Sequence, residues 1–304
     1  MLHPIHGSGA AISSNLGQLL HLDRKTKTLL ISCAAAGAIA SIFKSPVAAI
    51  IFAVEVFSLD LTISSLLPLL LASISSVLTS YFFMGDELLF DFKLIEDFKL
   101  KDTLFFIILG IGTGIASNYF NKIYFLTTRL FQKINNPFLK LVFGGLFLGV
   151  LIYAIPPLYG EGFSFINNLL SDHHIAALGQ TPFDNYMDNI WVVIGLLFGI
   201  IVFKAIAMST TLAIGGVGGI IIPTMVMGST LGNVIAKIIN NIGLGFHVSE
   251  SNFTLVGMAG LIAGVIHAPL TAIFLIAEIT GGYTLFIPLM ITVVVSFIIT
   301  KNTS

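Results

Sequence analysis

Charged residues are scarce in this 304-residue chain, which is 10% Asp, Glu, Lys and Arg and 56% hydrophobic. Soluble domains carry about 25% charged residues, and the mean hydropathy here is +0.99. This scarcity excludes an ordinary soluble domain, and a net charge of −1 argues against a nucleic-acid partner. The composition therefore indicates a protein that crosses a membrane several times.

Cysteine and metal-ligating clusters are also scarce. The single cysteine, Cys33, lies in the apolar stretch "LLISCAAAG", so a disulfide framework or a thiolate metal site is excluded. His173 and His174 are adjacent but have no partner cluster, and we interpret them as part of a solvated loop. There is no H-E-x-x-H motif and no Ser–His pair at a plausible spacing, so we predict no enzyme, no metal and no cofactor. No basic stretch leads into an apolar run at the N-terminus, so no cleavable signal peptide is expected.

Long stretches nearly without charge separate the few charged clusters. Each can cross a hydrocarbon core about 30 Å thick, which needs about 20 helical residues. The stretches are 61–85, 103–121, 141–160, 189–203, 205–236 and 279–300.

The connections between these stretches differ in charge. Residues 122–140 contain four basic residues and no acid, which predicts a cytoplasmic connection by the positive-inside rule. Residues 156–190 contain acids but no Lys or Arg, and residues 85–102 are also acidic overall. Both acidic stretches are predicted to lie on the outer side of the membrane. Each is separated from the basic connection 122–140 by one membrane crossing.

Two blocks of the chain repeat each other. Residues 36–56, "AGAIASIFKSPVAAIIFAVEV", align without gaps with residues 259–279, "AGLIAGVIHAPLTAIFLIAEI". The identical pairs include Pro46 with Pro269 and Glu55 with Glu278. Chance similarity between apolar stretches is the alternative, but it does not explain why Pro and Glu coincide in register. A second match overlays residues 4–13 on 223–232 and pairs Pro4 with Pro223.

Repeated membrane segments interrupted by Pro and Gly are typical of transporters, whose sites lie where broken helices meet. We expect Pro269 to begin a helix after a short break at His267 and Ala268, because its missing N–H is harmless there. Glu55 and Glu278 could form a proton relay. We favour structural buried carboxylates that accept hydrogen bonds from a neighbouring segment.

The most specific stretch is "GGVGGIIIPTMVMGSTLGN", residues 215–233. Its glycines precede an apolar helix, whose first N–H groups have no intrahelical partner and carry the positive end of the helix dipole. Such a helix start binds an anion without Arg or Lys, and only Lys44 and Lys204 lie near these segments. We expect a positive φ at Gly219. A helix-packing surface is the alternative for Gly228 and Gly232, which have small-xxx-small spacing.

Four motifs together resemble the chloride channel and chloride/proton antiporter (CLC) family, in a form typical of bacteria. They are residues 9–17, 34–56, 215–223 and 259–283, and the resemblance covers nearly the whole chain. The resemblance implies an all-α polytopic membrane protein, a CLC-like inverted-repeat helical bundle with broken helices. It also implies a homodimer, formed through helices around 46–82 and 269–300, with one anion pathway per subunit.

The resemblance also implies a binding site for the anion. In the family's G-x-F-x-P motif, backbone amides after the glycines hold the central anion. The matching anion-binding residues are Gly218, Gly219, Ile220, Ile221, Ile222 and Pro223. Ile221 stands where the family usually has Phe, which preserves the amide but changes the side chain beside the anion.

Several family residues are replaced or lie beyond the matched region. Leu2 stands at the position of the gating Glu in the G-x-E-x-P motif, whose Pro matches Pro4. Val56 occupies the position of the inner proton-accepting Glu. The earlier G-S-G-I-P motif is not found, the pore-lining Tyr is expected after residue 300, and Tyr283 belongs to another motif. We therefore expect residues 1–304 to be a single transmembrane core, clipped at both ends.

The sequence thus predicts transmembrane movement of chloride or a similar monovalent anion, passive or exchange-coupled, through a multi-pass protein of a bacterial plasma membrane. Two alternatives stay open. One is a secondary transporter of another substrate, although residues 215–223 lack the carboxylates that a cation or amino-acid carrier needs. The other is a non-transporting CLC fragment.

Overall fold

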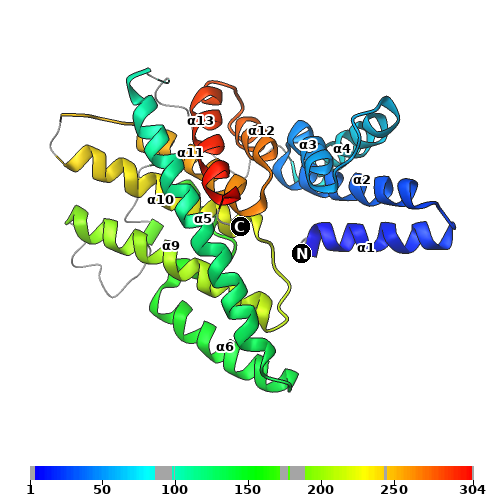
Figure 1. Ribbon diagram of the computed structural model, residues 1–304, viewed down its shortest axis with the longest axis horizontal. Coiled ribbons are helices and arrows are strands. Elements are labelled where there is room, and N and C mark those ends of the chain that lie inside the picture. The colour runs from blue at the N-terminus through cyan, green and yellow to red at the C-terminus, as the bar shows by residue number, and fades with distance from the viewer. Residues whose placement is uncertain are drawn as a thin grey trace. The chain divides into compact units, whose positions relative to one another are not determined.

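The computed structural model describes residues 4–85, 98, 100–171, 177–178, 189–242 and 245–302, the side chains of 4–8 excepted. Helices and turns make up these residues, and no strand occurs among them (Figure 1). The prediction of an all-α membrane fold is confirmed. The chain divides into two compact units, Met1–Asp91 with Ala268–Tyr283, and Phe92–His267 with Thr284–Ser304. Leu2, His173 and His174 lie outside the described residues.

The first unit is built from the start of the chain and one segment that returns from much later in the sequence. Its helices are α1 (Pro4–Leu19), α2 (Arg24–Phe43), α3 (Pro46–Phe57), α4 (Ile63–Met84) and the returning α12 (Pro269–Ile279). Helices α2 and α4 pack closely at Gly37, where an added Cβ would lie 2.6 Å from the Ser76 hydroxyl oxygen. Helix α3 packs against both of these helices and also against α12.

The internal repeat is visible in the backbone. Lys44 ends α2 with φ +52°, and His267 ends α11 (Glu250–Ile266) with φ +59°. Left-handed residues other than glycine are uncommon, yet both repeat blocks place a basic residue in this conformation. Two residues later, Pro46 and Pro269 begin the next helices. The expected break at His267 and Ala268 and the helix start at Pro269 are confirmed.

The second unit surrounds one buried helix. Residues 251–264 of α11 are all buried, with α5, α10 and α13 packed around them. The other elements of this unit are η1 (Leu100–Asp102), α5 (Thr103–Gln132), α6 (Pro137–Ala154), η2 (Pro156–Leu158), α7 (Phe163–Leu170), α9 (Ile190–Ala213), α10 (Ile221–Asn241) and α13 (Phe286–Lys301). Ser296 on α13 donates to the Gly260 carbonyl of α11 at 2.7 Å.

Small residues let the helices of the second unit approach α11. A Cβ on Gly260 would lie 2.6 Å from the Thr113 hydroxyl oxygen, and one on Gly264 would lie 2.7 Å from the Ser117 Cβ. In lipid there is little hydrophobic drive between helices, so close backbone packing and interhelical hydrogen bonds provide the association. These contacts explain why the α11 positions hold glycine.

Among the described residues, six helices are long and apolar enough to cross a membrane, namely α2, α4, the η1–α5 segment, α6, α9 and α10. Five of the six uncharged stretches overlap one of these helices, and the stretch 279–300 falls on the shorter α13. The run 205–236 is divided by the glycine loop between α9 and α10. Helix α2 was missed, because Arg24, Lys25 and Lys27 at its start interrupt the uncharged pattern.

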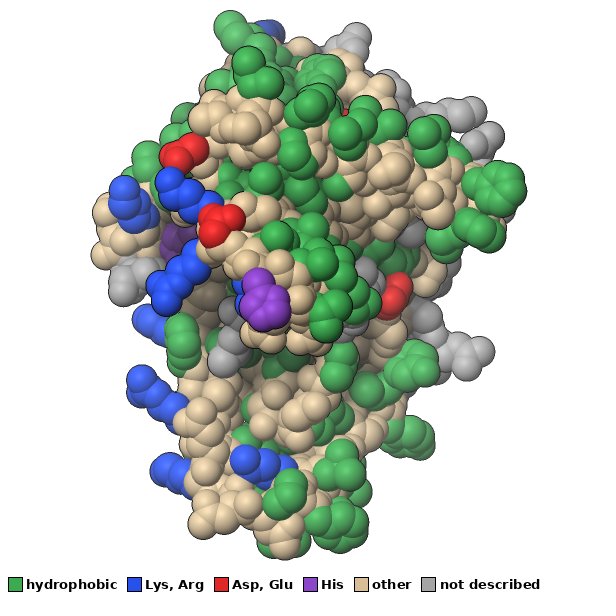
Figure 2. Space-filling view, turned by 90° about the vertical axis from the view of Figure 1, so that its right-hand side faces the viewer, with side chains coloured by type: hydrophobic (Ala, Val, Ile, Leu, Met, Phe, Trp, Pro, Cys, Tyr) green, Lys and Arg blue, Asp and Glu red, His purple; other side chains and the backbone are tan. Residues whose placement is uncertain are grey.

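Large hydrophobic side chains remain exposed on several helices. On α6 they include Phe143 (59% exposed), Leu146 (67%) and Val150 (63%), and on α4 they include Leu71 (63%) and Leu78 (63%). Figure 2 shows hydrophobic side chains over much of the visible face. Such a surface suits contact with lipid rather than water.

Candidate functional site

The connection between α9 and α10 carries the glycine run. Helix α9 ends at Ala213, and Gly215 reverses the chain with φ +98°. The Gly215 N–H donates to the Leu212 carbonyl at 3.2 Å, and the Gly216 N–H donates to the Thr211 carbonyl at 2.8 Å. This pattern ties the start of the loop to the last turn of α9, as glycine-terminated helices commonly do.

Helix α10 begins inside the stretch expected to bind an anion. Ile220 is the N-cap residue, and Ile221, Ile222 and Pro223 are the first three helical positions. No side chain caps the first turn, and that turn contains no acidic residue. The N–H groups of Ile221 and Ile222 occupy positions where a helix offers no backbone acceptor. They carry the positive end of a 21-residue helix, and Ile221 is only 7% exposed.

One detail differs from the sequence prediction. The left-handed glycine of the run is Gly215, not Gly219, because the chain reverses directly after α9. Helix α10 begins at Ile221, two residues before Pro223. Pro223 is tolerated within the first turn because its missing N–H would have no intrahelical partner there.

Glycines farther along α10 serve helix packing. A Cβ on Gly228 would lie 2.8 Å from the Met258 Cα, and one on Gly257 would lie 3.1 Å from the Gly232 Cα. The packing interpretation of Gly228 and Gly232 therefore agrees with the structure. Gly218 differs, because its added Cβ would meet only Leu212 and Met208 side chains at 3.8 Å or more. Helix packing does not explain the glycine at that position.

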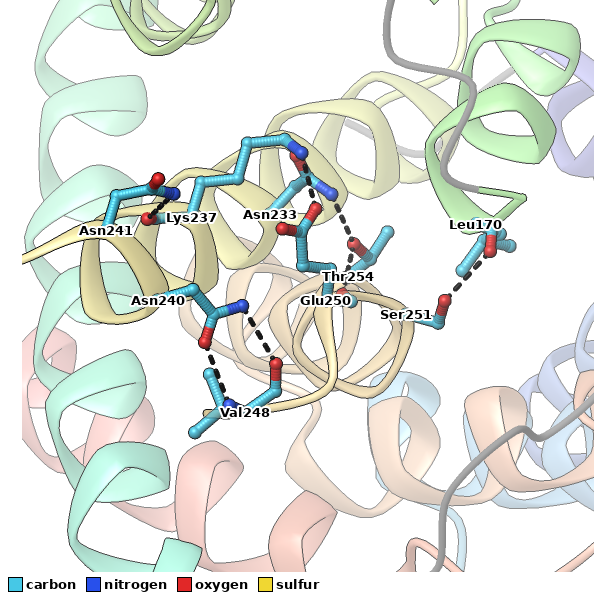
Figure 3. Close-up of polar contacts among 9 residues, drawn as sticks. All are labelled: Leu170, Asn233, Lys237, Asn240, Asn241, Val248, Glu250, Ser251 and Thr254. Carbon is cyan, nitrogen blue, oxygen red and sulfur yellow. Dashed lines mark hydrogen bonds and ion pairs between the residues drawn. The ribbon is translucent and has the colours of Figure 1, made fainter. Parts of the chain in front are cut away.

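The other end of α10 is anchored to α11 by polar contacts (Figure 3). Lys237, 2% exposed, forms an ion pair with Glu250 at the start of α11. The Asn240 side chain accepts from the Val248 N–H at 2.9 Å and donates to the Val248 carbonyl at 3.0 Å. These contacts hold the connection between the two helices in place. Sequence analysis missed the pair, although the uncharged run ends directly before Lys237.

The two lysines expected near the site both donate to backbone carbonyls. Lys204 is 4% exposed, and its Nζ donates to the Leu158 carbonyl at 3.1 Å and the Gly160 carbonyl at 3.2 Å. Lys44 Nζ donates to the Gly85 carbonyl at 2.7 Å and lies 4.6 Å from the centroid of the Tyr81 ring. Both ammonium groups thus bind backbone carbonyls in other parts of the chain.

Glu55 and Glu278 each cap the helix that carries the other. Glu278 on α12 accepts from the Val47 N–H at 3.1 Å and the Ala48 N–H at 2.7 Å, at the start of α3. Glu55 on α3 accepts from the first N–H groups of α12, namely Leu270 at 3.1 Å and Thr271 at 2.8 Å, and from the Thr271 hydroxyl at 2.7 Å. The donors are equivalent residues of the two repeats. This geometry favours a structural role over a proton relay.

The positions of the missing family carboxylates are only partly described. Leu2 lies outside the described residues, and Pro4 is the first residue of α1. Val56 follows Glu55 near the end of α3 and is half-buried. Its apolar side chain offers no titratable group at the inner position.

Comparison with known proteins identifies the family to which the chain is similar. The family model described as Voltage gated chloride channel matches residues 3–301. A ClcB-like protein of Ralstonia nicotianae is 26% identical over 300 residues, which cover 97% of this chain and 66% of that protein. The voltage-gated ClC-type chloride channel ClcB of Citrobacter koseri is 25% identical over 286 residues, covering 92% of this chain and 63% of that one. The chain thus spans less than two thirds of the length of either relative.

Solved structures agree with the family match. A slow cyanobacterial Cl−/H+ antiporter superimposes with a TM-score of 0.78 at 21% identity, covering 100% of this chain and 69% of that one. A CLC-type fluoride/proton antiporter superimposes with a TM-score of 0.75 at 22% identity, covering 99% and 70%. At these identities the likeness establishes a shared fold. With a family model matched over nearly its whole length, the chain belongs to the voltage-gated chloride channel family.

Proposed function

We propose that this chain moves chloride or a similar monovalent anion across a bacterial plasma membrane, and that the amides at the start of α10 hold the anion. The observation that carries the proposal is the first turn of α10, which is buried at Ile221 and has no side-chain cap. Buried N–H groups need a partner, and helix N-termini bind anions through such groups. The binding residues are the six from Gly218 to Pro223, in which Pro223 shapes the turn but donates no hydrogen bond.

The charges near this turn support transport rather than permanent binding. Lys204 and Lys237 are buried cations of the same unit, and both are engaged elsewhere. Lys204 donates to the carbonyls of Leu158 and Gly160, and Lys237 at the other end of α10 pairs with Glu250. The helix start therefore attracts an anion through partial charges alone. Conduction requires binding that is favourable enough for entry and weak enough for release, and partial charges satisfy both conditions better than a full charge.

The relatives support an anion as the substrate. Those compared above are described as a chloride channel, a chloride/proton antiporter and a fluoride/proton antiporter. The proposed site uses no side-chain chemistry that selects one halide over another. We therefore extend the proposal to the class of small monovalent anions.

The test removes one donor from the proposed site. Ile221→Pro deletes the N–H at the first helical position, where proline is otherwise well accepted. Losing one hydrogen bond to a charged partner costs about 1.5–3 kcal/mol, or roughly 10- to 150-fold in affinity. Chloride binding is measured by calorimetry in detergent, with gel filtration to confirm folding, because proline disfavours the helical conformation of the preceding Ile220.

Matched variants keep the backbone donor and change only the side chain. Ile221→Leu and Ile221→Phe retain the N–H and should bind chloride nearly as the parent chain does. If the parent binds chloride and folded Ile221→Pro binds it equally well, the amides of this turn do not form the site.

A further inference from the structure

Helix α6 contacts the rest of its unit through a small area. Gly144 is the buried residue of this helix, whose remaining residues are at least partly exposed. Phe143 and Leu146, on either side of the two central glycines, are 59% and 67% exposed. In Figure 1, α6 lies beside the end of α9, and these two helices pack against each other. Gly144 is therefore the one point at which α6 is closely covered.

The side chain that covers Gly144 is Ile214. A Cβ added to Gly144 would overlap the Ile214 Cγ2 methyl group and would lie 3.3 Å from the Ile214 Cβ. Gly145 and Gly149 on the same helix would meet nothing within 4 Å. Ile214 thus occupies a notch in α6 that exists only because residue 144 has no side chain. We call this contact the Gly144 notch.

Ile214 is also the residue that leads into the glycine run. It follows the last residue of α9, and its N–H donates to the Thr210 carbonyl at 3.0 Å. Gly215 then reverses the chain at φ +98°. A β-branched side chain has few favourable rotamers, so Ile214 has little freedom to leave the notch by rotation alone. Moving its side chain therefore moves the backbone at the start of the loop.

We propose that the Gly144 notch positions the glycine loop, and that Ile214 and Gly144 are positioning residues for the amide donors at Ile221 and Ile222. The loop between them is rich in glycine, which has more conformational freedom than any other residue. A contact with another helix restricts the paths that such a loop can follow. This inference rests on the proposed function for its effect on anion binding, but the positioning of the loop can be measured separately.

Four variants test the notch directly. Gly144→Ala places a methyl group where Ile214 sits, and Ile214→Ala empties the notch. The double variant restores a contact, because the two Cβ atoms would be 3.3 Å apart. Gly145→Ala is the matched control, since it makes the same change in helix propensity and its methyl group meets open space.

Two readouts are needed. The first is hydrogen exchange, by mass spectrometry, of peptides that contain residues 214–222, and it requires no anion. The second is chloride affinity by calorimetry, with gel filtration to show that each variant is folded. Overpacking typically costs 1–3 kcal/mol, and if displacement of the loop relieves this strain, Gly144→Ala should weaken chloride binding by roughly 5- to 150-fold. Exchange in 214–222 should become faster in both single variants, and Gly145→Ala should match the parent in both readouts.

The double variant distinguishes positioning from general damage. If Ile214 acts through Gly144, the double variant should lie closer to the parent than either single variant, in exchange and in affinity. Two results would overturn the proposal: hydrogen exchange of residues 214–222 that is unchanged in Gly144→Ala, or additive effects in the double variant. Either result would show that α6 moves to accommodate the change while the loop stays in place. If the parent binds no chloride but the exchange results follow the predicted order, the notch positions the loop and the proposed anion site is wrong.

Discussion

Replacing Glu278 tests whether two carboxylates hold the repeat helices α3 and α12 together. Glu278 accepts hydrogen bonds from the Val47 and Ala48 N–H groups at 3.1 and 2.7 Å. Ala48 is fully buried, whereas Val47 is 41% exposed. Glu278→Ala therefore leaves one donor buried without a partner and another that water can reach.

The expected loss follows from these two bonds. A hydrogen bond to a charged group contributes about 1.5–3 kcal/mol, and the Val47 bond is discounted because that residue is partly exposed. Glu278→Ala should therefore lower the free energy of unfolding by about 2–4 kcal/mol. Glu278→Gln keeps one acceptor oxygen and should lose about half as much. Thr271→Ala removes the hydroxyl bond to the Glu55 carboxylate, a single charged hydrogen bond, and should lose about 1.5–3 kcal/mol.

The assay is thermal unfolding in mild detergent at one fixed scan rate, because membrane proteins often unfold irreversibly. A loss of this size corresponds to a shift of several degrees in the unfolding midpoint. Asp60→Asn is the control, since Asp60 is an exposed carboxylate in the same unit. Unfolding of Glu278→Ala at the same temperature as the control would refute the capping argument. A double change at Glu55 and Glu278 should cost less than the sum of the single changes, because both caps join the same two helices.

Three further outcomes are expected. We expect a homodimer. A cysteine placed at Leu71, which is 63% exposed on α4, should therefore cross-link two copies of the chain in a Cys33→Ser background. A monomer in mild detergent that forms no cross-link would contradict this expectation. Because Val56 supplies no titratable group at the inner position, anion flux into liposomes should proceed without proton movement. Proton uptake driven by the anion gradient would contradict this absence of coupling. Hydrogen bonds from the Thr26 hydroxyl, the Thr26 N–H and the Lys25 N–H hold the pKa of the Asp23 carboxyl below its usual 3.8. The stability from this N-cap is therefore present above about pH 4 and lost as pH falls through the lowered pKa. Asp23→Asn keeps an acceptor and should flatten this acid dependence, measured as the difference in unfolding midpoint between about pH 7 and pH 3.

The amino-acid sequence by itself determined the class of the protein and the positions of its breaks. Long uncharged stretches indicate membrane helices, because lipid offers no partner for backbone groups outside regular structure. Pro46 and Pro269 favour helix starts, since the missing N–H of proline costs nothing at the first helical position. The glycine run likewise marks the start of α10, because few other residues allow the reversal at φ +98°.

Other features were decided only by tertiary structure. The sequence indicated that Glu278 accepts hydrogen bonds from a neighbouring segment, but not that its donors lie 230 and 231 residues away at the start of α3. Nothing in the local pattern distinguishes Gly144, which is covered by Ile214, from Gly145, which meets open space. The reason is physical: helix propensity and hydropathy act over a few neighbouring residues, whereas caps and notches form only where packing brings distant backbone groups and side chains together.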